Sequence, residues 1–160
     1  MNIGEICVRN VIDCRATTSV ADAARLMREQ HVGDLVVVEA RGGKHFPIGM
    51  ITDRDITIEV VALNVSVDRL AIGDIMSRDL ISVVESEDVF RTLQLMRRKS
   101  VRRLPVVDRQ GALVGIVALD DLLEILAEEM TLMVKLIARQ SEHEVHSRPS
   151  LETDRRGTTQ

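Results

Sequence analysis

The sequence predicts an α+β (α/β) fold in which a β-α-β-β-α unit occurs twice, packs with pseudo-twofold symmetry and is followed by a long C-terminal helix. A shift of 69 positions places Ile3-Gly4-Glu5-Ile6 on Ile72-Gly73-Asp74-Ile75, and the match continues through both halves. In each half the apolar spacing alternates between strand-like and helix-like periods in the same order. The last apolar stretch then runs from Leu119 to Gln140 without glycine or proline.

The order of elements within each half follows from the apolar spacing and from residues that begin helices. An apolar segment too short for a helix opens each half, so we expect a strand there. Ser19 and Asp88 are suited to cap the amphipathic helices that follow. β-branched runs then predict two further strands, and a second helix begins near Asp53 or Asp120. The expected strands are Val11–Ile12, Leu35–Val38 and Ile48–Ile51 in the first half, and Leu80–Val83, Leu104–Val107 and Leu113–Val117 in the second.

The repeat also predicts how the chain is divided. We expect residues 1–66 to form the first unit, 67–130 the second, 131–142 a helical extension and 143–160 a disordered polar tail. A unit of about 60 residues buries too little surface to be stable alone, so the two units are expected to share one core. Two related clefts are then expected where the units meet, because ligand sites favour concave junctions.

Composition argues against several classes of function. The net charge is -4 and the basic residues are spread along the chain, so binding to polyanions is not expected. Two phenylalanines without tyrosine or tryptophan leave almost nothing on which bases could stack. The N-terminal residues lack the long apolar stretch of a signal peptide or a membrane anchor. We therefore expect a cytoplasmic protein that binds neither nucleic acid nor membranes.

The sequence contains no evident catalytic or metal-binding constellation. Cys7 and Cys14 lack CxxC spacing and are interpreted as reduced core thiols. His143 and His146 lie three positions apart but have no acidic or thiolate companions at ligand spacing, so exposed side chains without a metal are favoured. No serine, cysteine or histidine stands in a nucleophile motif. We expect no enzymatic activity, no catalytic cofactor and no metal.

The stretch Gly49-Met50-Ile51-Thr52-Asp53-Arg54-Asp55 has chemistry that suits a nucleotide, because it stands where a strand ends and a helix begins. A helix N-terminus offers unpaired N–H groups to a phosphate. Thr52 adds a hydroxyl, Asp55 can accept hydrogen bonds from two ribose hydroxyls, and Arg54 adds positive charge. The alternative is a capping box, Thr-x-x-Asp, which would explain Thr52 and Asp55 without any ligand.

The whole pattern resembles a pair of CBS domains, also named a Bateman module, over about residues 3–130. The resemblance rests on the repeated Ile-Gly-x-Ile, the helices ending in Leu-Met-Arg, the strands Leu35–Val38 and Leu104–Val107, and the Gly-hydrophobic-hydrophobic-Thr-x-x-Asp motif. It implies a site where the Thr52 hydroxyl meets phosphate, Asp55 holds ribose, and adenine packs between aliphatic side chains. In the second copy it passes the role of Asp55 to Asp121.

The second copy departs from this motif, because Ala118 stands where the first copy has Thr52. A hydroxyl is therefore missing, and the second cleft is expected to be weaker or empty. Against this, Arg102-Arg103 lies before the second strand, where relatives that sense adenylate charge place phosphate-binding residues, and the first copy has Gly33-Asp34 there. Arginine forks suit phosphate, although exposed arginines are more often only solvated. The residues expected to bind ligand in the second copy are Asp120, Asp121, Arg102 and Arg103.

Two sets of aliphatic residues are expected to form the adenine-binding faces, in keeping with the scarcity of aromatic residues. All six residues would also be buried as core residues if no ligand existed, so both interpretations stay open. The sets are Val11, Ile12 and Ile51 in one cleft, and Leu80, Ile81 and Val117 in the other.

The C-terminal helix is expected to form a homodimer. Its apolar residues alternate at spacings of four and three, as in a heptad seam, and the helix is longer than the core of one CBS copy needs. We expect it to pack on its own module at the start and on a second subunit beyond it. The alternative is that it returns over its own sheet. The seam residues are Leu119, Leu123, Leu126, Met130, Met133 and Ile137.

The resemblance implies a regulatory, energy-sensing module that binds AMP, ADP, ATP or S-adenosylmethionine. Such a module signals to an effector protein by a conformational or oligomeric change, because a ligand shifts an equilibrium through its different affinities for two states. The alternative keeps the same fold without a ligand and makes the protein an oligomeric scaffold.

Overall fold

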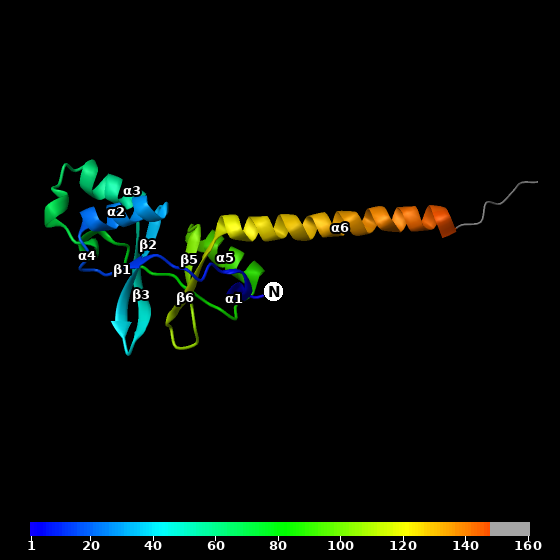
Figure 1. Cartoon of the computed structure of the whole chain (residues 1–160), viewed down its shortest axis with the longest axis horizontal. Coiled ribbons are helices and arrows are strands. Elements are labelled where there is room, and N and C mark those ends of the chain that lie inside the picture. The colour runs from blue at the N-terminus through cyan, green and yellow to red at the C-terminus, as the bar shows by residue number, and fades with distance from the viewer. Residues whose placement is uncertain (148–160) are drawn as a thin grey trace, which may run out of the picture. The chain divides into compact units, whose positions relative to one another are not determined.

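The computed structural model describes the backbone of residues 1–147 and the side chains of residues 1–140. The chain divides into two compact units, one from Met1 to Leu122 and one that begins at Leu123. Figure 1 shows their elements along the chain. The first unit contains both repeats, and the second continues the long C-terminal helix.

The two repeats contain the same elements in the same order. The first repeat comprises α1 (Ile3–Ile6), β1 (Asp13–Cys14), α2 (Val20–Gln30), β2 (Asp34–Arg41), β3 (Lys44–Thr52), α3 (Asp53–Ile56) and a π-helical turn (Thr57–Val61). A 3-10 turn (Val67–Arg69) leads to the second, which comprises α4 (Ile72–Ile75), β4 (Val83–Val84), α5 (Val89–Lys99), β5 (Arg103–Val107), β6 (Leu113–Ala118) and α6 (Leu119–Ser147).

Each repeat forms its own three-stranded sheet, in the order β1-β2-β3 and β4-β5-β6. The first strand of each sheet runs parallel to the middle one, and the third runs antiparallel to it. Asp34 pairs with Thr52 in one sheet as Arg103 pairs with Ala118 in the other. The predicted α+β fold with its β-α-β-β-α repeat is confirmed.

Helix caps form where the sequence predicted them. The Ser19 hydroxyl accepts a hydrogen bond from the Asp22 N–H at the start of α2, and the Asp88 carboxylate accepts from two N–H groups at the start of α5. Such caps satisfy N–H groups that have no partner within the helix. Both helices end at a residue in the left-handed conformation, His31 and Ser100. Caps at both ends therefore define a helix of 11 residues at equivalent positions in each repeat.

The first strands lie later in the sequence than predicted. We expected strands at Val11–Ile12 and Leu80–Val83, but β1 is Asp13–Cys14 and β4 is Val83–Val84. The apolar residues before them belong to segments that cross from one repeat to the other. Val8 pairs with Ile116 of the second sheet, and Ser77 pairs with Met50 of the first.

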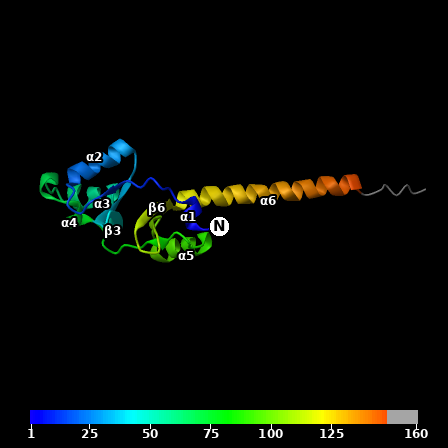
Figure 2. The same cartoon turned by 60° about the horizontal axis from the view of Figure 1, so that its bottom comes forward.

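The short helix at the start of each repeat packs against the other repeat. The N–H of Gly4 in α1 donates to the carbonyl of Glu85 at 2.7 Å, and the N–H of Gly73 in α4 donates to the carbonyl of Ala16 at 2.8 Å. Both views show α1 beside the second repeat, near α5 (Figures 1 and 2). The two repeats thus exchange their first segments.

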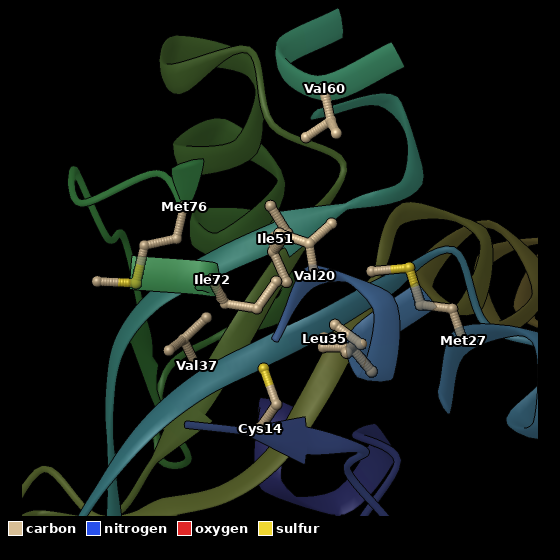
Figure 3. Packing of buried hydrophobic residues seen from close by; sticks show 10 residues of the cluster. Cys14, Val20, Met27, Leu35, Val37, Ile51, Val60, Ile72 and Met76 are labelled. Atoms are coloured by element: carbon tan, nitrogen blue, oxygen red, sulfur yellow. The ribbon is translucent and has the colours of Figure 1, made fainter. Parts of the chain in front are cut away.

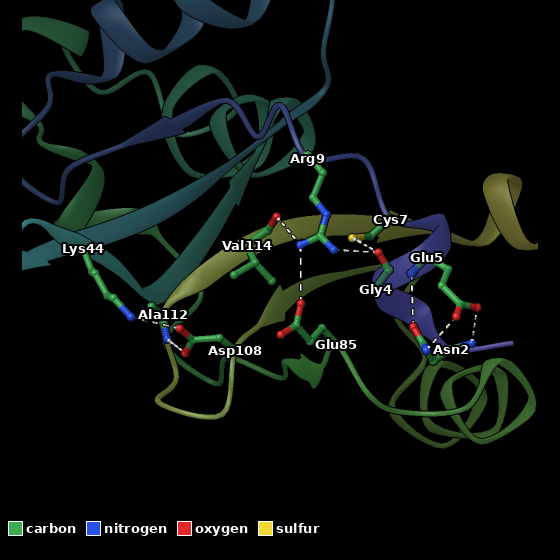
Figure 4. Close-up of polar contacts among 10 residues, drawn as sticks. All are labelled: Asn2, Gly4, Glu5, Cys7, Arg9, Lys44, Glu85, Asp108, Ala112 and Val114. Carbon is green, nitrogen blue, oxygen red and sulfur yellow. Dashed lines mark hydrogen bonds and ion pairs between the residues drawn. The ribbon is translucent and has the colours of Figure 1, made fainter.

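Arg9 fastens the first of these exchanged segments. Its guanidinium donates to the carbonyl oxygens of Gly4 at 2.6 Å and Val114 at 3.3 Å, and it lies 3.5 Å from the Glu85 carboxylate (Figure 4). Arg78, at the equivalent position, donates to the carbonyl of Gly73 at 2.7 Å. Arg9 therefore joins its crossing segment to the second repeat, whereas the bond of Arg78 lies within its own segment.

The exchange of first segments between the repeats also determines the composition of the hydrophobic core. Two buried clusters replace the single core that we expected, and each draws on both repeats. The first cluster surrounds Leu35 and Ile51 and includes Ile72 and Met76 of the second repeat (Figure 3). The second includes Ile3 of the first repeat. Neither repeat buries its own apolar face completely, so the pair is the folding unit.

The crossings also explain one glycine in each repeat. A Cβ atom at Gly49 would lie 2.7 Å from the Ser77 carbonyl oxygen, and one at Gly115 would lie 3.1 Å from that of Val8. At both places a strand of one repeat runs directly against the crossing segment of the other. The glycine that opens each Gly-x-x-Thr/Ala stretch is therefore required by packing.

The C-terminal helix is longer than predicted. α6 continues to Ser147, so residues 143–147 belong to the helix rather than to the tail, and the remaining tail (148–160) lies outside the described residues. No glycine or proline interrupts the sequence before Pro149, which explains the extension. Among the described helices, none combines the length and apolarity that crossing a membrane requires.

Both cysteines are free and buried. Burial raises the pKa of the Cys14 thiol to about 11, and the neighbouring Asp13 carboxylate adds to the shift. Burial also raises the pKa of Cys7, against the opposing charge of Arg9. Since the thiolate is the reactive form of cysteine, both residues behave as small apolar core side chains.

Candidate functional site

A cleft of about 690 Å³ lies between the two repeats and contains the predicted nucleotide motif. We name it the Thr52 cleft. Its first-repeat wall is formed by residues 33–34, Met50 and residues 52–55, and its second-repeat wall by Ser77, residues 79–81 and residues 100–104. The volume is within the range of small-molecule sites, which is about 300–1,000 Å³.

Thr52 and Asp55 form a capping box and also line this cleft. The Thr52 hydroxyl donates to Asp55 Oδ2 at 2.7 Å and accepts from the Asp55 N–H at 3.1 Å. The Thr52 N–H also donates to Asp55 Oδ2, at 2.8 Å. Both residues are half-buried, and among the described residues these bonds use only one oxygen of the carboxylate. The two interpretations of this motif are thus compatible, because the cap orients the groups that face the cleft.

The aliphatic wall of the Thr52 cleft differs from the predicted one. Leu80 and Ile81 line it, because their segment crosses to the first sheet. Val11 and Ile12, which we expected here, lie in the other cleft for the same reason. The grouping of aliphatic residues was therefore wrong: each motif faces the crossing segment of the opposite repeat.

Ile51 and Val117 were also expected on the adenine faces but are fully buried in the core. In a strand, successive side chains point to opposite faces. Met50 and Thr52 line the Thr52 cleft, so Ile51 between them points into the core. Val117 lies in the same way between two residues of the second cleft, Ile116 and Ala118. Strand alternation was the signal in the sequence that would have separated these residues.

The arginine pair, which we expected in the second cleft, lines the Thr52 cleft, and only Arg103 also belongs to the described lining of the second. Arg102 and Arg103 both line it, together with Arg54. All three are exposed, and Arg102 lies 3.6 Å from the Asp120 carboxylate. Three guanidinium groups beside Thr52 and Asp55 suit an anionic ligand, since arginine binds phosphate through parallel hydrogen bonds.

The second cleft is smaller, at about 270 Å³. Val11, Ile12, Ala118 and Asp121 line it. The Ala118 N–H donates to Asp121 Oδ2 at 2.8 Å, which reproduces half of the first capping box, but no hydroxyl is present. Asp120, predicted here, is not part of the described lining of either cleft and lies on the surface beside Arg102. The clefts therefore differ at Ala118, and a weaker or empty second cleft stays a prediction.

Five polar residues in the described lining of the Thr52 cleft had not been predicted as site residues: Asp34, Asp53, Ser77, Asp79 and Ser100. Ser77 and Asp79 belong to the crossing segment, whose pairing with Met50 has no local signal in the sequence. Ser100 ends α5 in the left-handed conformation, just before the arginine pair. The crossing therefore places Ser77 and Asp79 opposite the capping box.

An ion pair joins the two repeats beside the clefts. Arg103 Nη1 donates to Asp34 Oδ2 at 2.5 Å. Burial raises the pKa of Asp34, the Arg103 charge opposes this rise, and the Asp53 carboxylate adds to it. Asp34 is therefore a buried acid whose charge depends on one arginine.

Within the described residues, no group of three histidine, cysteine or acidic side chains is placed to hold a metal ion. The side chains of His143 and His146, which the sequence analysis considered, fall outside the described part of the chain.

Comparison with known proteins agrees with this architecture. The CBS domain family model matches residues 3–62 and 72–128, one match in each repeat. The chain is 39% identical to the uncharacterized protein MK0525 of Methanopyrus kandleri over 125 residues. This alignment covers 78% of this chain and 62% of that protein. It thus spans less than two thirds of that relative's length.

Two solved structures share the fold. An uncharacterized conserved protein from Pyrococcus horikoshii has a TM-score of 0.67 and 30% identity, covering 78% of this chain and 90% of that one. The CBS domain pair of protein MJ0100, in complex with 5′-methylthioadenosine and S-adenosyl-L-methionine, has a TM-score of 0.70 and 26% identity, covering 81% of this chain and 98% of that one. With a family match in both repeats, a common sheet order and a motif at the same place in each half, this chain belongs to the CBS domain family and contains two CBS domains.

Proposed function

We propose that the chain is a regulatory module that binds an adenosyl ligand, AMP, ADP, ATP or S-adenosylmethionine, in the Thr52 cleft. The observation that carries this proposal is the placement of Thr52 and Asp55 in a cleft of about 690 Å³ that three arginines also line. The related MJ0100 pair, whose solved complex contains two adenosyl compounds, supports the ligand class.

Different side chains of the cleft suit different parts of such a ligand. Leu80 and Ile81 offer apolar surface to adenine, the second carboxylate oxygen of Asp55 can accept from ribose hydroxyls, and Arg102 and Arg103 can bind phosphate. Asp121 with Val11 and Ile12 would serve a ligand in the second cleft, without the hydroxyl. As proposed, the module binds its ligand without converting it.

Signalling follows from the position of the Thr52 cleft. Residues of both repeats line it, so a ligand contacts both and favours the arrangement of the two that it fits best. An effector protein that distinguishes these arrangements would sense the ligand, and a ligand with equal affinity for both would not signal.

The test is isothermal titration of the chain with AMP, ADP, ATP and S-adenosylmethionine. At least one is expected to bind, and the double variant Thr52→Ala, Asp55→Ala is expected to weaken binding at least about tenfold, by the loss of hydrogen bonds to ribose and phosphate. No heat with any of the four would contradict the proposal.

The double variant also removes a helix cap, which costs about 1 kcal/mol by itself. Ser19→Ala, Asp22→Ala is the matched control, because Ser19 and Asp22 make the same hydroxyl and N–H bonds at the start of α2, at 2.7 and 3.0 Å. Neither Ser19 nor Asp22 belongs to the described lining of the Thr52 cleft. Equal loss of affinity in both double variants would attribute the effect to helix stability and contradict the assignment of the site.

We also propose that α6 pairs with α6 of a second copy. From Leu123 onward the helix exposes large apolar side chains, with Met130 66%, Met133 61% and Leu136 69% exposed. Residues 123–130 contain three glutamates and no basic residue, whereas residues 133–140 contain Lys135 and Arg139 and no acidic one. An antiparallel pair places the acidic part of one helix beside the basic part of the other, while a parallel pair repeats like charges.

Light scattering after gel filtration checks this pairing. The chain is expected to elute as a dimer, and Met130→Lys with Met133→Lys is expected to give a monomer, because each helix would bury two charges in the seam. Thr131→Lys, between these positions on the helix, is the control and is expected to stay dimeric. A monomeric wild type, or a dimeric lysine variant, would contradict the pairing. A dimer that binds none of the adenosyl ligands would favour the second candidate function, a scaffold.

A further inference from the structure

The ion pair between Asp34 and Arg103 joins equivalent positions of the two repeats. Asp34 is the first residue of β2 and pairs with Thr52; Arg103 is the first residue of β5 and pairs with Ala118. One repeat thus places an acid and the other a base at the same point of the fold, and the two meet at 2.5 Å.

Both residues line both clefts. Asp34 and Arg103 belong to the wall of the Thr52 cleft and to that of the second cleft. A ligand in either cleft therefore meets the same guanidinium and the same carboxylate. A ligand that changes this ion pair from one cleft therefore also changes the charge that faces the other cleft.

The two partners differ in burial. The Asp34 side chain is 8% exposed, whereas that of Arg103 is 46% exposed. Arg103 has five N–H donors and uses one of them on Asp34, so its exposed face can bind a further anion. The other charged or titratable groups along the two walls are Asp53, Arg54, Asp55, Asp79 and Arg102 in the Thr52 cleft, and His31 and Asp121 in the second.

We propose that this ion pair determines the ligand charge that the clefts accept and couples one cleft to the other. The inference rests on the proposed function, since it concerns the same adenosyl site. A phosphate oxygen in the Thr52 cleft competes with Asp34 for Arg103, while an uncharged adenosyl ligand leaves the pair intact. Because one guanidinium serves both clefts, phosphate in one also lowers the affinity of the other for phosphate.

Proton uptake is a further consequence. When Arg103 turns to a phosphate, Asp34 stays buried beside the Asp53 carboxylate with less compensation, and its protonated form is favoured. Binding of a phosphate ligand therefore takes up a proton, and its affinity rises as the pH falls. The phosphate of AMP titrates as well, so a variant without the Asp34 carboxyl group is the reference that removes the contribution of the ligand.

The test compares AMP with adenosine by isothermal titration in wild type and Asp34→Asn. Freeing Arg103 from its competitor is expected to tighten AMP binding about tenfold and to leave adenosine within about twofold. The AMP affinity of wild type is expected to rise more steeply than that of the variant between pH 8 and pH 6. Asp22→Asn, which breaks an exposed ion pair with Arg25 on α2, is the control and should change neither affinity.

The outcomes separate the two proposals. If wild type binds none of AMP, ADP, ATP and S-adenosylmethionine, the proposed function fails and this inference fails with it. If it binds one of them but neither AMP nor adenosine, only the inference is overturned. If both bind but Asp34→Asn leaves the ratio of their affinities unchanged, or weakens AMP, only the inference is overturned, because a purely structural acid would give that result. Should the single variant not fold, Asp34→Asn with Arg103→Gln restores a neutral pair, and its preference for AMP over adenosine should be at least about tenfold below that of wild type.

Discussion

Replacing Ile51 with alanine is expected to lower the free energy of unfolding by about 2–5 kcal/mol and to leave ligand affinity nearly unchanged. Ile51 is fully buried in the first core cluster, among residues of both repeats. Its replacement opens a cavity where β3 meets α4, and surrounding side chains can fill it only in part. The effect is measured by urea unfolding followed by circular dichroism, since the chain has no tryptophan or tyrosine.

Ile81→Ala is the matched comparison, because it removes the same atoms from the wall of the Thr52 cleft. Ile81 is only half-buried, so its replacement is expected to cost less stability than that of Ile51 while weakening adenosine binding several-fold. If Ile51→Ala instead weakened ligand binding and left stability unchanged, the side chain would have to face the cleft, and the assignment of core and wall would be wrong.

Some features of the molecule were predictable from the sequence, whereas others depend on how the two repeats pack. The repeat, the caps at Ser19 and Asp88 and the order of elements were predictable because they depend on local spacing and on side chains that bond to nearby N–H groups. The capping box at Thr52 and Asp55 is equally local. All of these elements are present in the structure.

The composition of each cleft was not predictable in the same way. It depends on the exchange of segments between repeats, which pairs Val8 with Ile116 and Ser77 with Met50. These contacts join residues far apart in the sequence, and internal symmetry does not distinguish a repeat that contacts itself from one that contacts its copy. We therefore assigned Leu80 and Ile81 to the wrong motif, although each was identified as a wall residue.

Two of the positions at which the repeats differ carry the chemistry of the clefts. Thr52 corresponds to Ala118, and Asp34 corresponds to Arg103, while the packing residues around them stay apolar in both copies. Because the scaffold is the same, a single substitution in one repeat is enough to make the two clefts different. The ion pair between the copies exists only because Asp34 and Arg103 differ in charge.

Arg103→Met is expected to lower the free energy of unfolding by about 3 kcal/mol at neutral pH, since it leaves the buried Asp34 carboxylate without its partner. Burial already raises the pKa of Asp34 above its ordinary value of 3.8, and without Arg103 it rises further. The folded state then binds the Asp34 proton more tightly than the unfolded state. Stability is therefore retained at low pH and lost as the pH rises from 3.8 through the raised pKa.

Urea unfolding of wild type and Arg103→Met between pH 4 and pH 7 checks this dependence, and the difference between the two proteins should grow as the pH rises. Adding Asp34→Asn to Arg103→Met should recover most of the loss and abolish its pH dependence, because the buried charge is then absent. Arg25→Met, which breaks the exposed pair with Asp22, is expected to cost no more than about 0.5 kcal/mol at any of these pH values. A loss in Arg103→Met that is independent of pH and persists with Asp34→Asn would mean that Arg103 stabilises the fold through its packing rather than its charge, and that Asp34 does not depend on it.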